Sequence, residues 1–252
     1  METWQIATLL VIGALGGVWN AIAGGATLFT FPALMAVGLP PVVANATNYL
    51  ALLPSNAAAL PAYLDELSGL GRKLAPLILV SGAGAIIGSL ILVVSDPEVF
   101  VALIPFLILT ATILFAFGER FREMVMARAG AARVDLYAYI ALFLCSIYGG
   151  YFGAGLGIIL LAIAQIMGFT DFHVANSIKN LLATSFTLLS IVIFGIGGLI
   201  AWPEAITMII GSTVGGYFGG RLAKHVNQSY LRLVVIGFGL VLSLVYFART
   251  FG

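Results

Sequence analysis

Long apolar segments separated by few charges are the feature that most constrains how this chain can fold. Ten such segments occupy residues 5–19, 26–38, 42–61, 74–95, 98–117, 136–149, 155–168, 173–200, 204–222 and 230–248. Only 8% of the residues are charged, whereas soluble domains average about 25%, and the mean hydropathy is +1.13. These values exclude a soluble globule. Because the apolar runs are continuous rather than alternating, they predict an all-α polytopic membrane protein and not a barrel.

One hydrophilic stretch divides the ten segments into two sets of five. It covers residues 118–135, and we expect it to be a solvated linker between a first membrane repeat, 1–117, and a second, 136–252. Several residues of the two halves match at one fixed offset of 131. The matches are Asn45 with Asn176, Gly24 with Gly155, Ser81 with Ser212, Gly84 with Gly215 and Gly88 with Gly219. They indicate an internal repeat, with shared membrane composition as the alternative.

The basic residues predict how the segments are oriented. If the N-terminus is periplasmic and each segment reverses direction, most basic residues face the cytoplasm and the acidic loop residues face outward, as the positive-inside rule requires. The cytoplasmic set is Arg72, Lys73, the arginines of the linker, Arg221 and Lys224, and the outward set is Asp96, Glu98 and Glu204, with Arg249 as an exception. Five reversals per half make the two repeats inverted and place both termini in the periplasm.

The first two segments of each half are short. Each is about 14 residues, or about 20 Å as a helix, against about 30 Å of hydrocarbon. Glycine-rich stretches separate the two members of each pair, at residues 16–25 and 149–157. We expect either thin spans or re-entrant hairpins with glycine tips near the substrate, at Gly24, Gly25, Gly153, Gly155 and Gly157. The alternative use of these glycines is close helix packing.

Lys179 is the only formal charge between residues 172 and 200. A helix places Asn176, Lys179 and Asn180 on one face, and a lysine in such an apolar helix should meet a partner, a cavity or a ligand. The matching face of the first half carries Asn45, Thr47 and Asn48. These six residues are the candidate substrate-binding residues. They predict a pocket for a small oxygen-rich anion, in which Lys179 supplies charge and the amides donate hydrogen bonds.

Two other interpretations stay open for this cluster. Lys179 could extend its amine to the membrane interface, and each asparagine could hold helices together instead of binding a ligand. The rest of the sequence offers no metal site, since His173 and His225 are far apart. It also has no catalytic triad and no phosphate-binding loop. We therefore expect no enzyme activity, no cofactor and no nucleic-acid partner.

Two motifs resemble the TauE/SafE sulfite exporter family, also called TSUP permeases. The second half carries Gly-Gly-x-Phe-Gly-x-Gly-x-Gly at residues 149–157 and Ala-Asn-Ser-Ile-Lys-Asn at 175–180. The first half carries paired glycines at 16–17 and 24–25, Pro32, and Ala-Asn-Ala-Thr at 44–47. The resemblance spans essentially the whole chain. It departs at residues 19–23, where the first half lacks the alternating glycines of the second, so the two hairpins need not contribute equally.

The resemblance implies a transporter of the bacterial inner membrane for small sulfur-containing anions such as sulfite or organosulfonates. We expect an exporter, with the anion bound near the midplane between the repeats. A channel-like pore and a transporter of another small anion are the alternatives. The partners expected are this anion and the lipid bilayer, and a homodimer is left open as the assembly.

Overall fold

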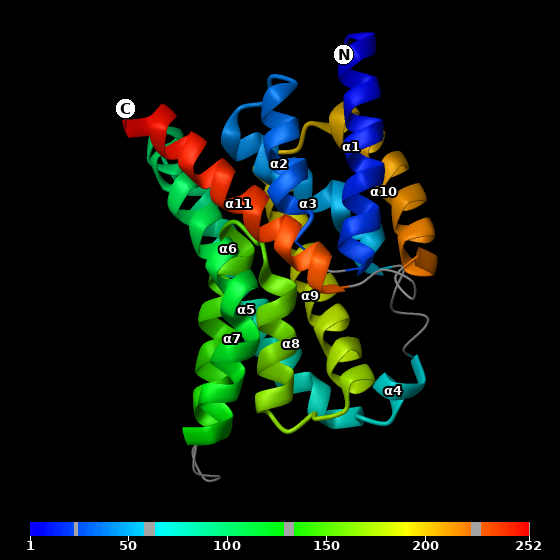
Figure 1. Cartoon of the computed structure of the whole chain (residues 1–252), viewed down its shortest axis with the longest axis vertical. Coiled ribbons are helices and arrows are strands. Elements are labelled where there is room, and N and C mark those ends of the chain that lie inside the picture. Colours follow the sequence, from blue (N-terminus) through cyan, green and yellow to red (C-terminus); the bar gives the residue numbers. More distant parts are fainter. Residues whose placement is uncertain (23–24, 58–63, 129–133, 223–227, 252) are drawn as a thin grey trace.

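The computed structural model describes residues 1–22, 25–57, 64–128, 134–222 and 228–251. Throughout these ranges the regular structure is helical, with no strand (Figure 1). The first half contains α1 (Thr3–Ile22), α2 (Thr27–Ala36), α3 (Pro41–Ala57), the short α4 (Leu64–Ser68), a 3-10 turn (Gly71–Lys73), α5 (Leu74–Val94) and α6 (Pro97–Arg128). The second half contains α7 (Val134–Tyr151), α8 (Leu156–Ile166), α9 (Phe172–Ile196), α10 (Trp202–Leu222) and α11 (Gln228–Phe251). A helix lies at each of the ten predicted segments, so the all-α prediction is confirmed.

Helix lengths correct two details of the prediction. We expected both segments of each leading pair to be short, but α1 has 20 residues and α7 has 18, or about 30 and 27 Å. Only the second members are short, since α2 has 10 residues and α8 has 11. The predicted linker is also partly helical, because α6 continues to Arg128. Charged residues do not end a helix by themselves, since Glu, Lys and Arg are good helix formers.

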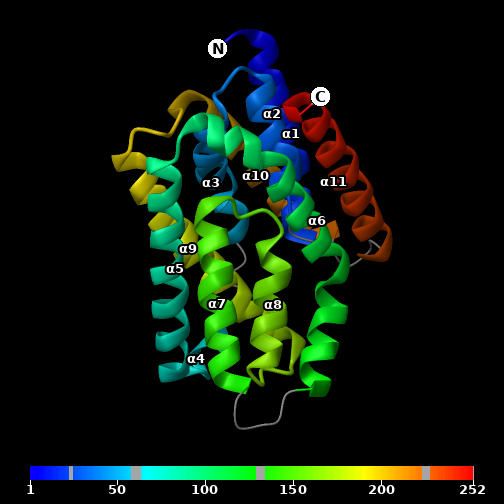
Figure 2. The same cartoon turned by 90° about the vertical axis from the view of Figure 1, so that its left-hand side faces the viewer.

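Each short helix returns beside the long helix that precedes it. In Figure 2, α7 rises to about half the height of the molecule and α8 runs back down next to it. At the opposite end of the molecule, α1 and α2 pack together in the same way (Figure 1). The N-terminal ends of α2 and α8 therefore lie in the interior of the bundle, where Leu28 and Leu156 are buried.

Backbone contacts hold the first helix of each half against the fourth long helix of the other half, leaving the short α4 out of the count. Along most of their lengths, α1 packs on α10 and α7 packs on α5. A methyl group at Gly88 would overlap the carbonyl oxygen of Ile147, and one at Gly215 would overlap that of Ala14. Glycine at these two positions lets the helix backbones touch, which is how membrane helices gain packing energy where the hydrophobic effect is absent.

The surface and the interior have the polarity expected of a protein surrounded by lipid. Large apolar side chains cover the outside, among them Val94 at 80% and Ile196 at 85% exposure. Serine, threonine and asparagine side chains are buried instead, and several bind carbonyl groups, as Ser212 does with Ala51. By length and composition, two segments of the described chain could each cross a membrane alone, Gly71–Val94 and Val174–Ile196. Shorter apolar helical segments occupy Thr27–Ala36, Pro97–Ile113, Leu136–Tyr151 and Ile236–Phe251.

The contact between α1 and α10 predicts how two glycines respond to the same exchange. Gly215→Ala should lower the melting temperature of the purified protein, because overpacking a close contact costs about 1–3 kcal/mol. Gly237→Ala is the matched control, since no atom lies within 4 Å of a Cβ at that position, and alanine is the better helix former. Equal melting temperatures for the two variants would contradict this account of the packing.

Candidate functional site

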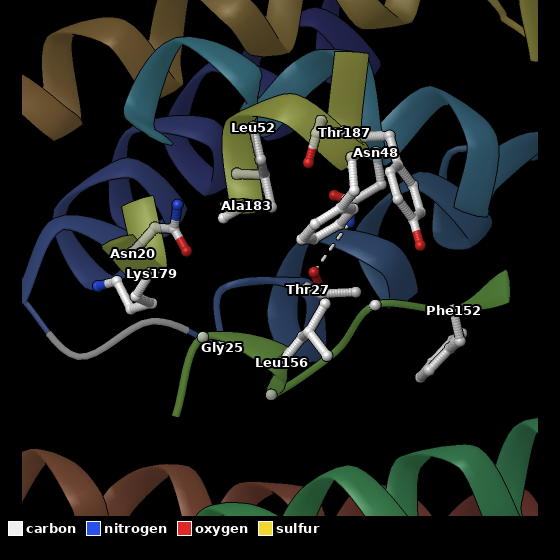
Figure 3. A pocket seen from close by; sticks show the side chains of 15 residues that line it. Asn20, Gly25, Thr27, Asn48, Leu52, Phe152, Leu156, Lys179, Ala183 and Thr187 are labelled. Atoms are coloured by element: carbon white, nitrogen blue, oxygen red, sulfur yellow. Dashed lines mark hydrogen bonds between the residues drawn. The ribbon is translucent and has the colours of Figure 1, made fainter. Parts of the chain in front are cut away.

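One pocket lies where the turns of the two hairpins meet α3 and α9 (Figure 3). Its open space is about 80 Å³, which suits a few water molecules or a ligand of only a few heavy atoms. The lining residues come from five helices and the two turns. They are Asn20, Gly25, Thr27, Asn48, Tyr49, Leu52, Phe152, Gly153, Gly155, Leu156, Gly157, Lys179, Ala183, Phe186 and Thr187.

Lys179 is the only charged residue that lines this pocket. It lies in the second turn of α9 and is partly buried. Within the part of the chain that the structure describes, Lys179 forms no hydrogen bond and no ion pair. Its Cδ lies 3.8 Å from the position that a Cβ on Gly157 would take, so the aliphatic part of the lysine passes over the first turn of α8. Figure 3 shows Lys179 beside Asn20 of α1.

The hairpin turns bring backbone groups to the pocket. Gly153 and Gly155 both have φ +73°, and Gly25 has φ +81°, which is the left-handed region that favours glycine. Directly after these turns, α8 begins at Leu156 and α2 at Thr27. Some of the first N–H groups are already bonded, since Leu28 and Phe29 of α2 donate to the carbonyl oxygens of Gly25 and Ala26 and Leu156 of α8 donates to that of Gly153. The pocket still has two helix N-termini on its wall, and their partial positive charge favours anions.

The wall formed by α3 carries polar groups of a different kind. Asn48 donates a hydrogen bond from Nδ2 to Thr27 Oγ1 over 3.2 Å (Figure 3), while its Oδ1 is buried without a hydrogen-bond partner in the described chain. The next residue, Tyr49, donates its hydroxyl to the carbonyl oxygen of Gly149. Asn48 thus has a polar atom that a ligand or water could satisfy, whereas the tyrosine hydroxyl ties α3 to the α7–α8 hairpin.

Part of the predicted constellation lines this pocket. Asn48, Lys179, Gly25, Gly153, Gly155 and Gly157 are on its wall, whereas Asn45, Thr47, Asn176 and Asn180 are not. Asn45 donates instead to the carbonyl oxygen of Tyr151, and the hydroxyl of Thr47 accepts the N–H of Ala201. These two side chains join α3 to other parts of the bundle, which was the alternative use of buried polar groups. Gly24 lies outside the described residues.

Sequence reasoning missed several residues of the pocket. Asn20 is one of them, although it is a lone amide in an apolar stretch, and it donates to the hydroxyl of Ser55. Ala183 and Thr187 follow Lys179 at four-residue intervals, so helical periodicity alone puts them on the same face. Phe152 and Phe186 had no such signal, because aromatic residues are common all along this chain.

Comparison with known proteins identifies the family of the chain. The family described as sulfite exporter TauE/SafE matches residues 9–246. A probable membrane transporter protein of Haemophilus influenzae is 28% identical, over 96% of this chain and 94% of its own length. Probable membrane transporter protein YfcA of Escherichia coli K12 is 28% identical, over 94% of this chain and 88% of its own. The probable membrane transporter protein ORF9 of a Sinorhizobium species is 25% identical, over 95% and 92%.

No solved structure matches the chain. The family match covers nearly all of its length, and the three relatives align with it almost from end to end. The resemblance noted from the glycine and asparagine motifs is thereby confirmed. This chain belongs to the sulfite exporter TauE/SafE family of membrane transporters.

Proposed function

We propose that this protein carries a small sulfur-containing anion, such as sulfite or an organosulfonate, across the bacterial inner membrane and releases it outside. The pocket around Lys179 is its binding site. The observation that carries the proposal is a single cation on the pocket wall with no counter-ion in the described chain. A buried, unpaired charge is costly, and a bound anion removes that cost.

The other groups on the wall suit the same ligand. Two helix N-termini bring partial positive charge to anionic oxygens, and amide or hydroxyl donors of Asn20, Thr27 and Asn48 can add hydrogen bonds. Leu52, Leu156 and Phe186 supply apolar area beside these donors, where a short alkyl group of an organosulfonate can rest. The small open space limits the ligand to a few heavy atoms. A larger organic anion does not fit this state of the pocket.

Inverted repeats are part of the proposal. Asn48 and Lys179 are related by the offset of 131, as are Leu52 and Ala183, and both pairs line the pocket. The first helix of each half also packs on a helix of the other half, α1 on α10 and α7 on α5, which supports a two-fold relation of the halves. We propose that the pocket lies on this two-fold axis, so that tilting one repeat against the other opens it to alternate sides.

Packing indicates that the offset between the halves is not constant. Gly88 meets Ile147 as Gly215 meets Ala14, so the helices α5 and α10 are equivalent at a separation of 127 residues rather than 131. The sequence matches of Gly84 with Gly215 and of Gly88 with Gly219 are therefore not the pairs that pack alike. A four-residue change is about one helical turn, which keeps the same helix face toward its neighbour.

Lys179→Met tests the binding site. We expect a stable, membrane-inserted protein whose affinity for its anion falls at least about tenfold, or ~1.4 kcal/mol, because the charge is lost while the length is kept. Binding of sulfite, sulfate, thiosulfate and methanesulfonate to the purified protein is measured by thermal shift and titration calorimetry. Lys73→Met is the matched control, since Lys73 is exposed and lies outside the pocket.

Wild-type affinity in the Lys179→Met variant would refute the proposed role of the lysine. It would favour the alternative in which the amine reaches the membrane interface. Saturable uptake in liposomes distinguishes a transporter from a channel-like pore, since a pore shows flux that rises linearly with anion concentration.

Positive-inside counting makes a separate prediction about topology. We propose that the stretch 118–135 faces the cytoplasm and both termini face the periplasm. In a Cys145→Ser background, Met126→Cys should react with a membrane-impermeant maleimide only after the cells are permeabilised, and Glu2→Cys should react in intact cells. Labelling of position 126 in intact cells would reverse the orientation.

A further inference from the structure

We propose that this transporter moves its anion together with a proton, and that Lys179 is the group that carries the proton. The inference rests on the proposed function of the pocket. In this scheme the ammonium form of Lys179 holds the anion, both are released on the far side of the membrane, and the empty protein returns with a neutral amine.

The carboxylates that the structure describes lie away from the pocket. The chain has ten carboxylates, and none of those whose side chains the structure describes lines the pocket. Seven have a described exposure, and none of these seven is buried. The nearest along the helix is Asp171, about 12 Å before Lys179, where it caps the N–H of Val174. No residue of the pocket wall can therefore neutralise an ammonium group at Lys179.

Among the side chains that the structure describes, the helices that pack against α9 add no counter-ion either. They are α3, α4, α5, α7 and α8. Their titratable residues are Tyr49 on α3, Asp65 and Glu66 on α4, and Asp135, Tyr137, Tyr139, Cys145, Tyr148 and Tyr151 on α7. In the described chain neither carboxylate of α4 pairs with Lys179, and α5 and α8 contain no ionisable side chain.

Two tyrosines close to the hairpin turn are already engaged. Tyr49 donates to the carbonyl oxygen of Gly149, and Tyr148 donates to that of Ala154 over 2.9 Å. A phenol held in this way acts as a neutral donor to the backbone and does not supply a negative charge. Lys179 is thus the one group on the pocket wall that can change its charge at ordinary pH.

The pocket without its anion is the state that requires Lys179 to lose its proton. When the pocket holds an anion, the ammonium group is paired. When the anion has left and the pocket is closed to both sides, the ammonium would face a wall whose described residues are neutral amides, hydroxyls and apolar side chains without a counter-charge, which is unfavourable. Release of the proton to water before closure removes that charge, because burial without a counter-ion favours the neutral amine.

The step balances without any other reactant. On one side of the membrane the amine of Lys179 takes one proton from water and becomes an ammonium, and a monovalent anion binds to it. On the other side the anion leaves and the N–H bond breaks to give the proton back to water. One proton accompanies each anion, so transport of a monovalent anion moves no net charge. The direction of net flow follows the combined gradients of anion and proton, so export occurs when the outward gradient of the anion exceeds the inward gradient of protons.

A lysine that kept its proton would give different behaviour. The empty protein could not pass through its closed state, and only a bound anion would let it return. Such a protein exchanges one anion for another but carries out no net transport. Arginine at position 179 should show this behaviour, because its guanidinium does not lose its proton in proteins.

The test uses the purified full-length protein in liposomes that contain a pH-sensitive dye, with methanesulfonate as the probe. This sulfonate stays monovalent at every working pH, so a change of internal pH reports protons that move with transport. For the wild type we expect an acidic exterior to drive accumulation, with one proton entering per methanesulfonate. A potassium diffusion potential should leave the rate unchanged.

Lys179→Arg separates net transport from exchange. We expect acid-driven net uptake and the proton signal to fall at least about tenfold, since the cation is permanent. Exchange of labelled for unlabelled methanesulfonate in the same liposomes should persist. Lys73→Arg, an exposed position outside the pocket, should match the wild type in both assays.

Each contrary result has its own meaning. Wild-type uptake without proton entry, or uptake driven by the diffusion potential, overturns proton coupling while leaving the binding site intact. Net uptake by Lys179→Arg at the wild-type rate with protons still moving overturns the role of Lys179 as the carrier. If Lys179→Arg also loses exchange, the number of protons that enter the liposomes with each methanesulfonate in the wild type decides whether transport is coupled to protons. Full binding by Lys179→Met refutes the proposed role of the lysine, and no saturable wild-type uptake refutes the proposed transport; either result overturns this inference as well.

Discussion

Close backbone contact between helices is the interaction on which the architecture depends. Where the surroundings are lipid, burying apolar surface gains little, so helices associate through packing and hydrogen bonds. The glycines at positions 88 and 215 let α5 and α10 lie directly on α7 and α1. These two helix pairs hold the long arm of each hairpin in place. The short arms, α2 and α8, can then end inside the protein without being exposed to hydrocarbon.

The interior ends of the short arms create the functional chemistry. A helix that starts within the bundle brings the positive end of its dipole to a region where water is scarce, and irregular backbone at that depth is tolerated only in contact with protein or a cavity. Gly153 and Gly155 allow the turn before α8 because both adopt positive φ. Lys179 then lies across the first turn of α8. A membrane transporter of the TauE/SafE family thus combines a cation with helix N-termini in one small pocket.

The residues on opposite walls are unequal, and this asymmetry has a physical meaning. Asn48 of α3 and Lys179 of α9 both line the pocket and are separated by the same 131 residues as the sequence matches between the halves, but an amide costs far less to bury than an ammonium group. Two lysines would repel each other in the empty pocket, and two asparagines would attract an anion weakly. Under the proposed function, one charge with one amide would attract a monovalent anion, and Lys179 would be the single group left with an unpaired charge when the anion departs.

The sequence by itself determined the all-helical fold, the positions of ten segments and Lys179 as the exceptional residue, because hydrophobicity along the chain and the cost of a charge in lipid are local properties. It could not determine which buried polar groups face a cavity. Asn45 and Asn48 lie one turn apart, yet one binds the backbone of Tyr151 and the other reaches the pocket. Nor could it place Asn20 or the aromatic side chains on the wall. Those assignments depend on which helices lie side by side, and only the tertiary packing of α1 on α10 and α5 on α7 decides that.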